Sequence, residues 1–346
     1  MTEAVLAAYH RRNRRRAVLV GVMAVAALLA LLTDLMTGPS GLPLSQVWGA
    51  LTGAEDISRG TRVIVWDVRL PVAVMALLVG AALAMAGAEM QTVLENPLAE
   101  PFTLGVSAAA ALGAATAIVL GLTLPFLPPV WSVSVNAFLF ALGALALLQL
   151  LGRLRGGGTE VLILFGIALN FAAGAFLSLL QFVSSADALQ QLVFWTMGSL
   201  ASANWASAAI LAAVLICTLP FAFRASWQLT ALRMGEDQAR SYGVDVTALR
   251  RWALLRVSLL AATAVSMVGI IGFVGLAGPH IARMLVGEDH RFLLPASVLT
   301  GALVMSLASV LAKLVVPGVL LPVGLVTSLI GLPIFFALIL RGRGRA

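Results

Sequence analysis

The sequence predicts an all-α integral membrane protein with about ten transmembrane helices. Of its 346 residues, 61% are hydrophobic and only 11% are charged, and the mean hydropathy is +1.02. A soluble domain has about 45–50% apolar and about 25% charged residues. Because a water-facing globule of this size could not bury the excess of apolar residues, we expect a membrane to surround most of the chain.

The apolar residues fall in nine blocks that are nearly free of charge: residues 17–36, 70–94, 102–122, 130–151, 160–183, 206–223, 253–278, 292–312 and 323–340. A helix needs roughly 20 residues to cross a hydrocarbon core of about 30 Å, and these blocks are too long for barrel strands. The block that ends at Gly278 runs through Pro279 into residues 280–286. We interpret this stretch as a tight pair of helices that breaks at Gly278-Pro279, with His280 at a helix start.

The charge distribution predicts how the chain is oriented. The net charge is +7, and only four of the 22 Lys and Arg residues fall in outer segments when the N-terminus is placed inside: Arg59, Arg62, Arg69 and Lys313. By the positive-inside rule, both termini are then cytoplasmic. The charges are spread over every second loop, whereas a nucleic-acid site needs one contiguous basic face. We expect a single permease-like domain over 1–346, with a basic cytoplasmic tail at 1–16.

The longest inner segment, residues 224–252, contains the features of a short helix from Gly235 to Gly243. Glu236 and Asp237 fall in its first turn, where the helix dipole favours negative charge. Arg240 follows Glu236 at i+4, a stabilising spacing on a helix surface. Gly243 provides a left-handed C-terminal cap. Such a helix suits contact with a cytoplasmic partner; the alternative is a plain amphipathic connector.

Residues 68–114, VRLPVAVMALLVGAALAMAGAEMQTVLENPLAEPFTLGVSAAAALGA, resemble the signature of the iron-siderophore, haem and vitamin B12 permease family of bacterial importers. The stretches GEDQARSYGV, GFVGLAGPHIARMLVGEDHRFLLPASVLTGA and LPVGLVTSLIGLPIFFALIL follow in the family's order. The resemblance covers essentially the whole chain and implies a vitamin B12 permease-like fold. It also implies a pair of permeases in the bacterial inner membrane, two ATPase subunits on the inner face and a substrate-binding protein outside. We expect the pair to be a homodimer, and a heterodimer with a related permease is the alternative.

The resemblance also implies roles for particular residues. The family's ATPase-coupling helix matches Gly235, Glu236, Asp237, Gln238, Ala239, Arg240, Ser241 and Gly243. Outer arginines of the family, which pair with glutamates of the binding protein, match Arg69 and Lys313. Where the family often has a second arginine after RLP, this chain has Val72, so Arg62 or Arg59 is the expected replacement.

Two further positions lie at inner turns. The family's inner gate corresponds to the start of the fifth span, at Thr159 and Glu160. The turn after the second span holds Asn96, Pro97 and Glu100, and because proline cannot continue a helix we expect it to be structural, helping to seat the coupling segment.

ATP chemistry is expected on another chain. A Walker A loop needs a lysine at the phosphates, and Lys313, the only lysine here, lies in SVLAKLVV without glycines around it. We therefore expect no catalytic residue and no cofactor in this chain, with ATP and Mg²⁺ held by the partner ATPase. The scattered His10, His280 and His290 predict no metal site, and the lone Cys217 predicts no disulfide.

The expected cargo is a ferric siderophore, because siderophore permeases dominate the family; haem and vitamin B12 are the alternatives. An ion-coupled secondary transporter would need charges within the membrane, where the sequence offers only Glu89 and Asp34. For Glu89 we expect a structural pairing with an inner arginine, and a proton relay is the alternative. An intramembrane enzyme would need catalytic groups that face one another within the spans, and the sequence shows no such set.

Overall fold

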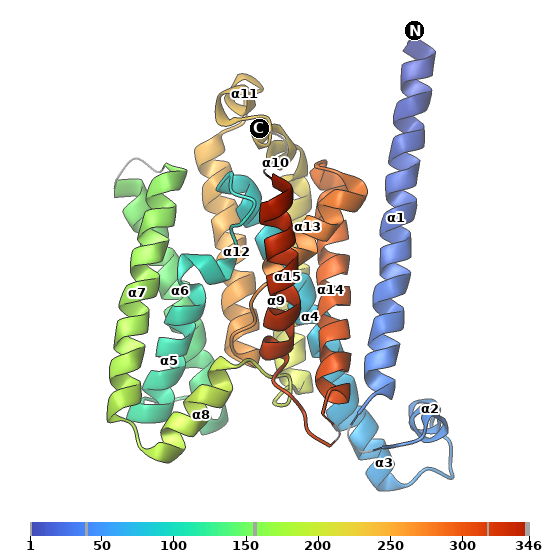
Figure 1. The fold of residues 1–346 in the computed structure, drawn as a ribbon, viewed down its shortest axis with the longest axis vertical. Helices are drawn as coiled ribbons and strands as arrows, with labels where there is room; N and C mark the ends of the chain where they lie inside the picture. The colour runs from blue at the N-terminus through green and yellow to red at the C-terminus, as the bar shows by residue number, and fades with distance from the viewer. Residues whose placement is uncertain (1, 39–40, 155–157, 317, 343–346) are drawn as a thin grey trace.

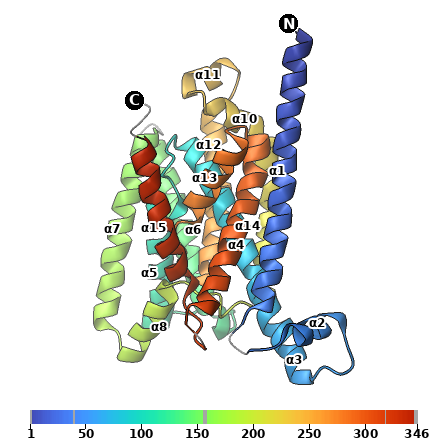
Figure 2. The ribbon, with the colours of Figure 1, turned by 45° about the vertical axis from the view of Figure 1, so that its right-hand side comes forward.

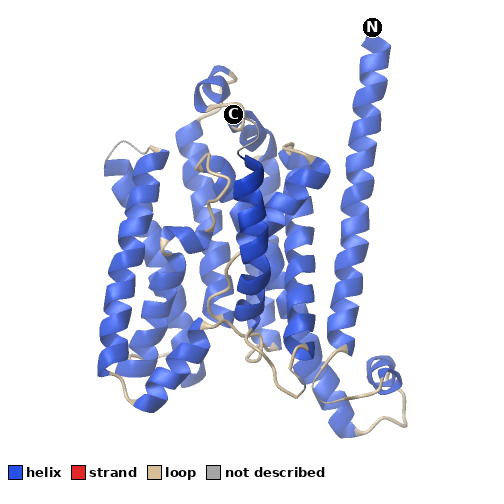
Figure 3. Ribbon diagram, in the orientation of Figure 1, coloured by secondary structure: helices blue, strands red, loops and turns tan. Residues whose placement is uncertain are grey.

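The computed structural model describes residues 2–38, 41–154, 158–316 and 318–342, and this described part is helical with no β-strand (Figures 1 and 3). Seven of its helices are long and apolar enough to cross a membrane. They comprise α1 (Thr2–Met36), α4 (Leu70–Val93) with the turns before it, α6 (Ser132–Leu154), α7 (Thr159–Val183), α9 (Trp205–Arg224), α12 (Val246–Val268) and α14 (His290–Leu314).

Three shorter apolar helices complete the bundle: α5 (Val106–Leu120), α13 (Val274–Val286) and α15 (Val323–Gly342). With these included, the described residues confirm the prediction of about ten membrane helices. The 3₁₀ turns η2 (Pro101–Leu104) and η3 (Pro129–Trp131) precede α5 and α6. Because α13 has only 13 residues, it reaches about 20 Å and does not cross a bilayer alone.

The remaining helices lie at the two ends of the bundle (Figures 1 and 2). One end carries α10 (Ser226–Leu232), α11 (Glu236–Ser241) and the start of α1, and we call it the α11 end. The opposite, α2 end carries α2 (Leu44–Thr52), α3 (Arg59–Val63) and α8 (Ala186–Thr196). A π-helical turn, η1 (Ile64–Arg69), joins α3 to α4.

The predicted helix break at Gly278-Pro279 is wrong. The chain leaves α12 at Gly269 (φ 77°) and enters α13 after Phe273 (φ 67°), so Pro279 and His280 lie within α13. A proline inside a helix leaves the carbonyl four residues earlier without its backbone partner. Here that carbonyl, of Gly275, accepts a hydrogen bond from Nε2 of Gln91 at 3.4 Å, which allows the helix to continue past the proline.

The basic tail at 1–16 forms the first turns of a helix, and its place in the cytoplasm stays a prediction. Helix α1 runs without interruption from Thr2 to Met36, and its first turns extend beyond the other helices at the α11 end (Figures 1 and 2). The arginines of this region are therefore held in a fixed helical register.

The centre of the bundle is built from α4, α12 and α14. In the most apolar window of each span, 72% of the residues are buried in α4 and α12 and 67% in α14, against 17% in α7. Helices α4 and α14 approach so closely that a Cβ atom added at Gly301 would overlap the Gly80 carbonyl oxygen. Lipid provides no hydrophobic force between helices, and such close contact between small residues is what stabilises their association.

Two buried ion pairs connect these spans. Glu89 of α4 accepts hydrogen bonds from Nε of Arg256 of α12 at 2.9 and 3.0 Å, and the Glu89 side chain is fully buried. Asp34 of α1 accepts a hydrogen bond from Nζ of Lys313 of α14 at 2.8 Å, and both are buried. The expected structural pairing of Glu89 with an arginine is thus confirmed.

The contact between Gly80 and Gly301 predicts a strong effect of one methyl group. We expect Gly301→Ala to destabilise the protein by about 1–3 kcal/mol or more, because the added atom must push α4 and α14 apart. Gly21→Ala in α1 is the control, since nothing lies within 4 Å of its added Cβ. Thermal unfolding in detergent measures both; equal melting temperatures for the two variants would contradict the close packing.

The pair of Glu89 and Arg256 predicts a non-additive result. We expect Glu89→Leu alone to cost about 3–5 kcal/mol, because it leaves the Arg256 charge buried without its carboxylate. The double variant Glu89→Leu/Arg256→Met should recover most of this loss, since buried ion pairs are often replaceable by apolar residues of similar volume. Chemical unfolding of the wild type, Glu89→Leu, Arg256→Met and the double variant tests this, and a loss in the double variant equal to the sum of the two single losses would refute the pairing.

Candidate coupling site at the α11 end

Helix α11 has the local structure that its sequence predicts. Glu236 starts the helix and pairs with Arg240 at 2.6 Å, the predicted i+4 contact. Gly243 has a φ of 81°, and its N–H donates to the Arg240 carbonyl at 2.9 Å, so the predicted left-handed cap is confirmed. Gly235 precedes the helix with a φ of 109°, where a side chain would be strained.

The surface of α11 is polar and faces away from the bundle. Asp237, Gln238, Arg240 and Ser241 are exposed, whereas Ala239 is fully buried. Figure 1 shows α11 as the outermost element of this end apart from the start of α1. Ala239 therefore packs toward the bundle, while the polar side chains of α11 lie on a surface that another molecule can reach.

Arg250 connects α11 to the central helix α4. It lies in α12, is 8% exposed, and donates to Glu236 at 3.4 Å. Its Nε donates to the carbonyl of Val93, the last residue of α4, at 2.9 Å. Our sequence reasoning missed this residue. Arg250 shares an i, i+3, i+4, i+7 spacing with the buried Val246, Leu249 and Ala253, and that spacing could have placed it on the inner face of α12.

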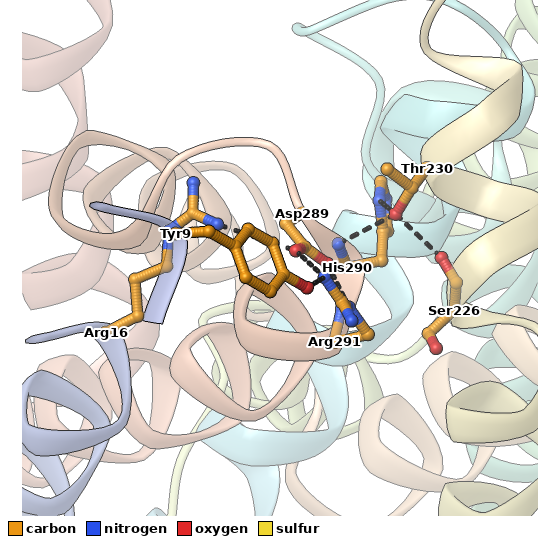
Figure 4. A network of polar contacts seen from close by, with 7 residues as sticks. All are labelled: Tyr9, Arg16, Ser226, Thr230, Asp289, His290 and Arg291. Carbon is orange, nitrogen blue, oxygen red and sulfur yellow. Dashed lines mark hydrogen bonds and ion pairs between the residues drawn. The ribbon is translucent and has the colours of Figure 1, made fainter. Parts of the chain in front are cut away.

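His290 makes a second connection between α4 and the segment that leads to α11, and Figure 4 shows its contact with Thr230 on that segment. It is fully buried, and its Nε2 lies 2.8 Å from the hydroxyl of Thr92 in α4. The Thr92 hydroxyl also donates to the Ala88 carbonyl at 2.9 Å. The backbone N–H of His290 donates to Thr230 of α10 at 3.0 Å.

Helix α1 is attached beside this histidine (Figure 4). Asp289, which caps α14, accepts from Arg291 at 2.7 Å and pairs with Arg16 of α1 at 3.5 Å. Arg291 in turn donates to the Tyr9 hydroxyl at 3.4 Å. The hydrogen bond from Arg291 holds the pKa of Asp289 below its ordinary value, so this carboxylate stays charged.

The predicted inner turn divides into two parts. Asn96 accepts from the N–H of Leu98 at 2.9 Å, and Pro97 is exposed beside it. Glu100 is instead buried, and it accepts hydrogen bonds from the backbone N–H groups of Phe273 and Leu276 at the start of α13. A carboxylate at a helix N-terminus satisfies donors that have no partner within the helix, so Glu100 fixes where α13 begins.

The structure brings the coupling residues near the predicted gate. A cavity of about 400 Å³ is lined by Glu236, Arg240 and Arg250 on one side and by Gly158 and Leu162 of the α7 region on the other. Thr159 is the first residue of α7, as predicted, and Glu160 beside it is exposed. A gating role for Thr159 and Glu160 stays a prediction.

At the α2 end, the four basic residues differ in accessibility. Arg59 and Arg62 are exposed on α3. Arg69 is buried and donates to the carbonyls of Leu35 and Met36, at the end of α1. Lys313 is buried against Asp34. Docking through these residues stays a prediction, and the geometry makes Arg59 and Arg62 the two that a partner reaches directly.

Within the described residues, no group of three or more His, Cys, Asp or Glu side chains could hold a metal ion.

Comparison with known proteins agrees with this architecture. The FecCD transport family matches residues 25–341. The hemin transport system permease protein HmuU of Yersinia pestis is 39% identical over 81% of this chain and 84% of its own. The vitamin B12 import system permease protein BtuC of Klebsiella pneumoniae is 34% identical over 99% of both. A solved structure described as an inward-facing conformation of a metal-chelate type ABC transporter has a TM-score of 0.82 and 31% identity, over 93% of this chain and 99% of that one. The chain therefore belongs to the FecCD transport family and is the membrane-embedded permease subunit of an ATP-binding-cassette importer.

Proposed function

We propose that two copies of this chain form the translocation path for a bulky metal chelate, and that α11 receives the movement of a separate ATPase subunit. The α11 end faces the cytoplasm of a bacterial cell in this proposal, because the segments at this end carry most of the arginines. A binding protein delivers cargo to the α2 end. ATP and Mg²⁺ bind to the ATPase, and this chain holds neither.

The observation that carries the coupling role is the chain of contacts from α11 to α4. Glu236 of α11 accepts from Arg250, and Arg250 donates to the end of α4. A rigid element that is displaced by a partner moves whatever is bonded to it. Since α4 is among the most buried spans, displacement of α11 acts directly on the centre of the bundle.

Helix α7 is the best candidate for the wall of the path. It is the least buried of the long spans, and Asn170 lies exposed in its middle. Polar side chains within a membrane face a protein partner or water rather than lipid. A second permease opposite α7 would enclose Asn170 in a water-filled route between the two copies.

The cargo class follows from the relatives, whose names specify hemin and vitamin B12. Both are large organic metal chelates, as ferric siderophores are. A ferric siderophore remains our first expectation for this chain, with haem and vitamin B12 as alternatives. The metal travels within its chelate as part of the substrate.

Arg250→Ala should lower uptake of the cargo while the partner ATPase still hydrolyses ATP. We expect uptake to fall by about 10- to 100-fold, because losing a hydrogen bond to a charged group costs about 1.5–3 kcal/mol. The measurement is ATP-dependent uptake of ferric siderophore, haem and cobalamin, side by side, in proteoliposomes with the ATPase and binding protein encoded beside the gene. The cargo that accumulates identifies the substrate.

Arg251→Ala is the matched control, since Arg251 is the adjacent arginine but is exposed. Comparable loss in both variants would remove the specific role of Arg250. Uptake without ATP, or no association with an ATPase, would refute the proposed function and favour an ion-coupled transporter.

Asn170 provides a test of the path. Cys217 is the only cysteine, so Cys217→Ser gives a cysteine-free background. We expect Asn170→Cys in this background to react with a water-soluble, charged thiol reagent in the assembled transporter. Val25→Cys on the exposed face of α1 should remain unreactive, because it faces lipid. Equal reactivity at the two positions would place α7 outside the path.

A further inference from the structure

One face of α1 carries exposed arginines at its N-terminal end and exposed apolar residues along the rest of its length. Arg11, Arg14 and Arg15 follow i, i+3, i+4 spacing, so their side chains share one face of the helix. All three are exposed. The same stripe continues along the helix with Val18, Val22, Val25 and Leu29, which are also exposed. Charged groups at one end are thus followed by an apolar run of about 17 Å.

The opposite side of α1 is the one that packs on the bundle. Tyr9, Asn13 and Arg16 follow i, i+4, i+7 spacing, and Tyr9 and Arg16 contact Arg291 and Asp289 (Figure 4). Met23 and Ala27 continue this side and are buried. The arginine stripe therefore points away from the protein, and α1 stands at the edge of the bundle in Figures 1 and 2.

The depth of the arginines matches that of lipid phosphates. Arg16 pairs with Asp289, the residue that caps the start of the span α14. Arg15, Arg14 and Arg11 lie one to five residues beyond Arg16, or about 1.5–7.5 Å farther along the axis. The polar layer on each side of a bilayer is about 5–7 Å thick, so the guanidinium groups reach the headgroup region.

Partners within the chain do not account for these charges. Among the described side chains, the ion pairs of this region join Arg16 and Arg291 to Asp289, and none involves Arg11, Arg14 or Arg15. A second copy placed by a two-fold axis along the membrane normal would bring the same arginines of both copies to the same level. Like charges of the two copies would then face each other, which disfavours a second copy of this chain as the partner of the arginines.

We propose that this stripe of α1 binds a phospholipid with an anionic headgroup, whose phosphate contacts Arg11, Arg14 and Arg15 and whose acyl chain lies along Val18, Val22, Val25 and Leu29. Guanidinium groups bind phosphate oxygens in a bidentate manner and remain charged at all relevant pH values. Each basic residue near an anionic membrane surface tightens binding by about 5-fold.

The test is native mass spectrometry of the purified full-length chain, titrated with dioleoyl phosphatidylglycerol or with dioleoyl phosphatidylcholine. We expect the phosphatidylglycerol to bind more tightly. Arg11→Gln/Arg14→Gln/Arg15→Gln should weaken its apparent affinity about 100-fold and leave phosphatidylcholine unaffected. The corresponding triple substitution with lysine should retain most of the preference, because it keeps the charge.

Melting temperatures in phosphatidylcholine should match for all variants. If the glutamine triple variant does not fold, Arg14→Gln alone should still weaken phosphatidylglycerol binding about 5-fold.

Arg59→Gln/Arg62→Gln, which removes exposed arginines at the other end, is the control and should keep the preference for phosphatidylglycerol. The proposal is wrong if the glutamine triple variant keeps that preference, or if the control loses it equally. It is also wrong if the triple variant keeps its lipid but no longer co-purifies with the ATPase, which would assign the stripe to a protein partner.

Discussion

Helices α4 and α14 approach until the carbonyl oxygen of Gly80 occupies the space in which a side chain at residue 301 would lie. In water, burial of larger apolar side chains would drive such an association, but lipid tails are as apolar as the helices themselves. Van der Waals packing between small residues therefore stabilises this interface. The same kind of contact recurs elsewhere, since an added Cβ at Gly87 would overlap the Gly275 carbonyl of α13 and one at Gly113 the Asn136 carbonyl of α6.

The last turns of α4 carry most of these polar contacts. Glu89 binds Arg256 of α12, Gln91 binds the Gly275 carbonyl of α13, Thr92 contacts His290 of α14, and the Val93 carbonyl accepts from Arg250 of α12. Together these bonds join one short stretch of α4, residues 89–93, to α12, α13 and α14. A displacement of α11 thus reaches several helices through one short segment, which is the property that a coupled permease needs.

The sequence predicts what is local and misses what is distant. The cap at Gly243 and the pair of Glu236 and Arg240 depend on neighbours within a few residues, and both were predicted. For Glu89 the sequence predicted an arginine partner but not which arginine, because Arg256 is 167 residues away. The break at Gly278-Pro279 was misplaced since the Gln91 amide, far away in sequence, satisfies the carbonyl that Pro279 leaves unpaired. Lys313 was expected at the surface, and the buried partner Asp34 could not be identified from spacing.

Asp289 and His290 are adjacent at the start of α14 and face opposite ways. Asp289 faces α1 through Arg16, whereas His290 faces α4 and α10 through Thr92 and Thr230. The N-terminus of α14 is therefore held between the peripheral helix and the segment that precedes α11. A force on α1 from its surrounding lipid would act one residue away from the contact between α4 and α10. If α11 receives the movement of the ATPase and α1 binds lipid, as we propose, the two would meet at this helix start without a direct contact between α1 and α11.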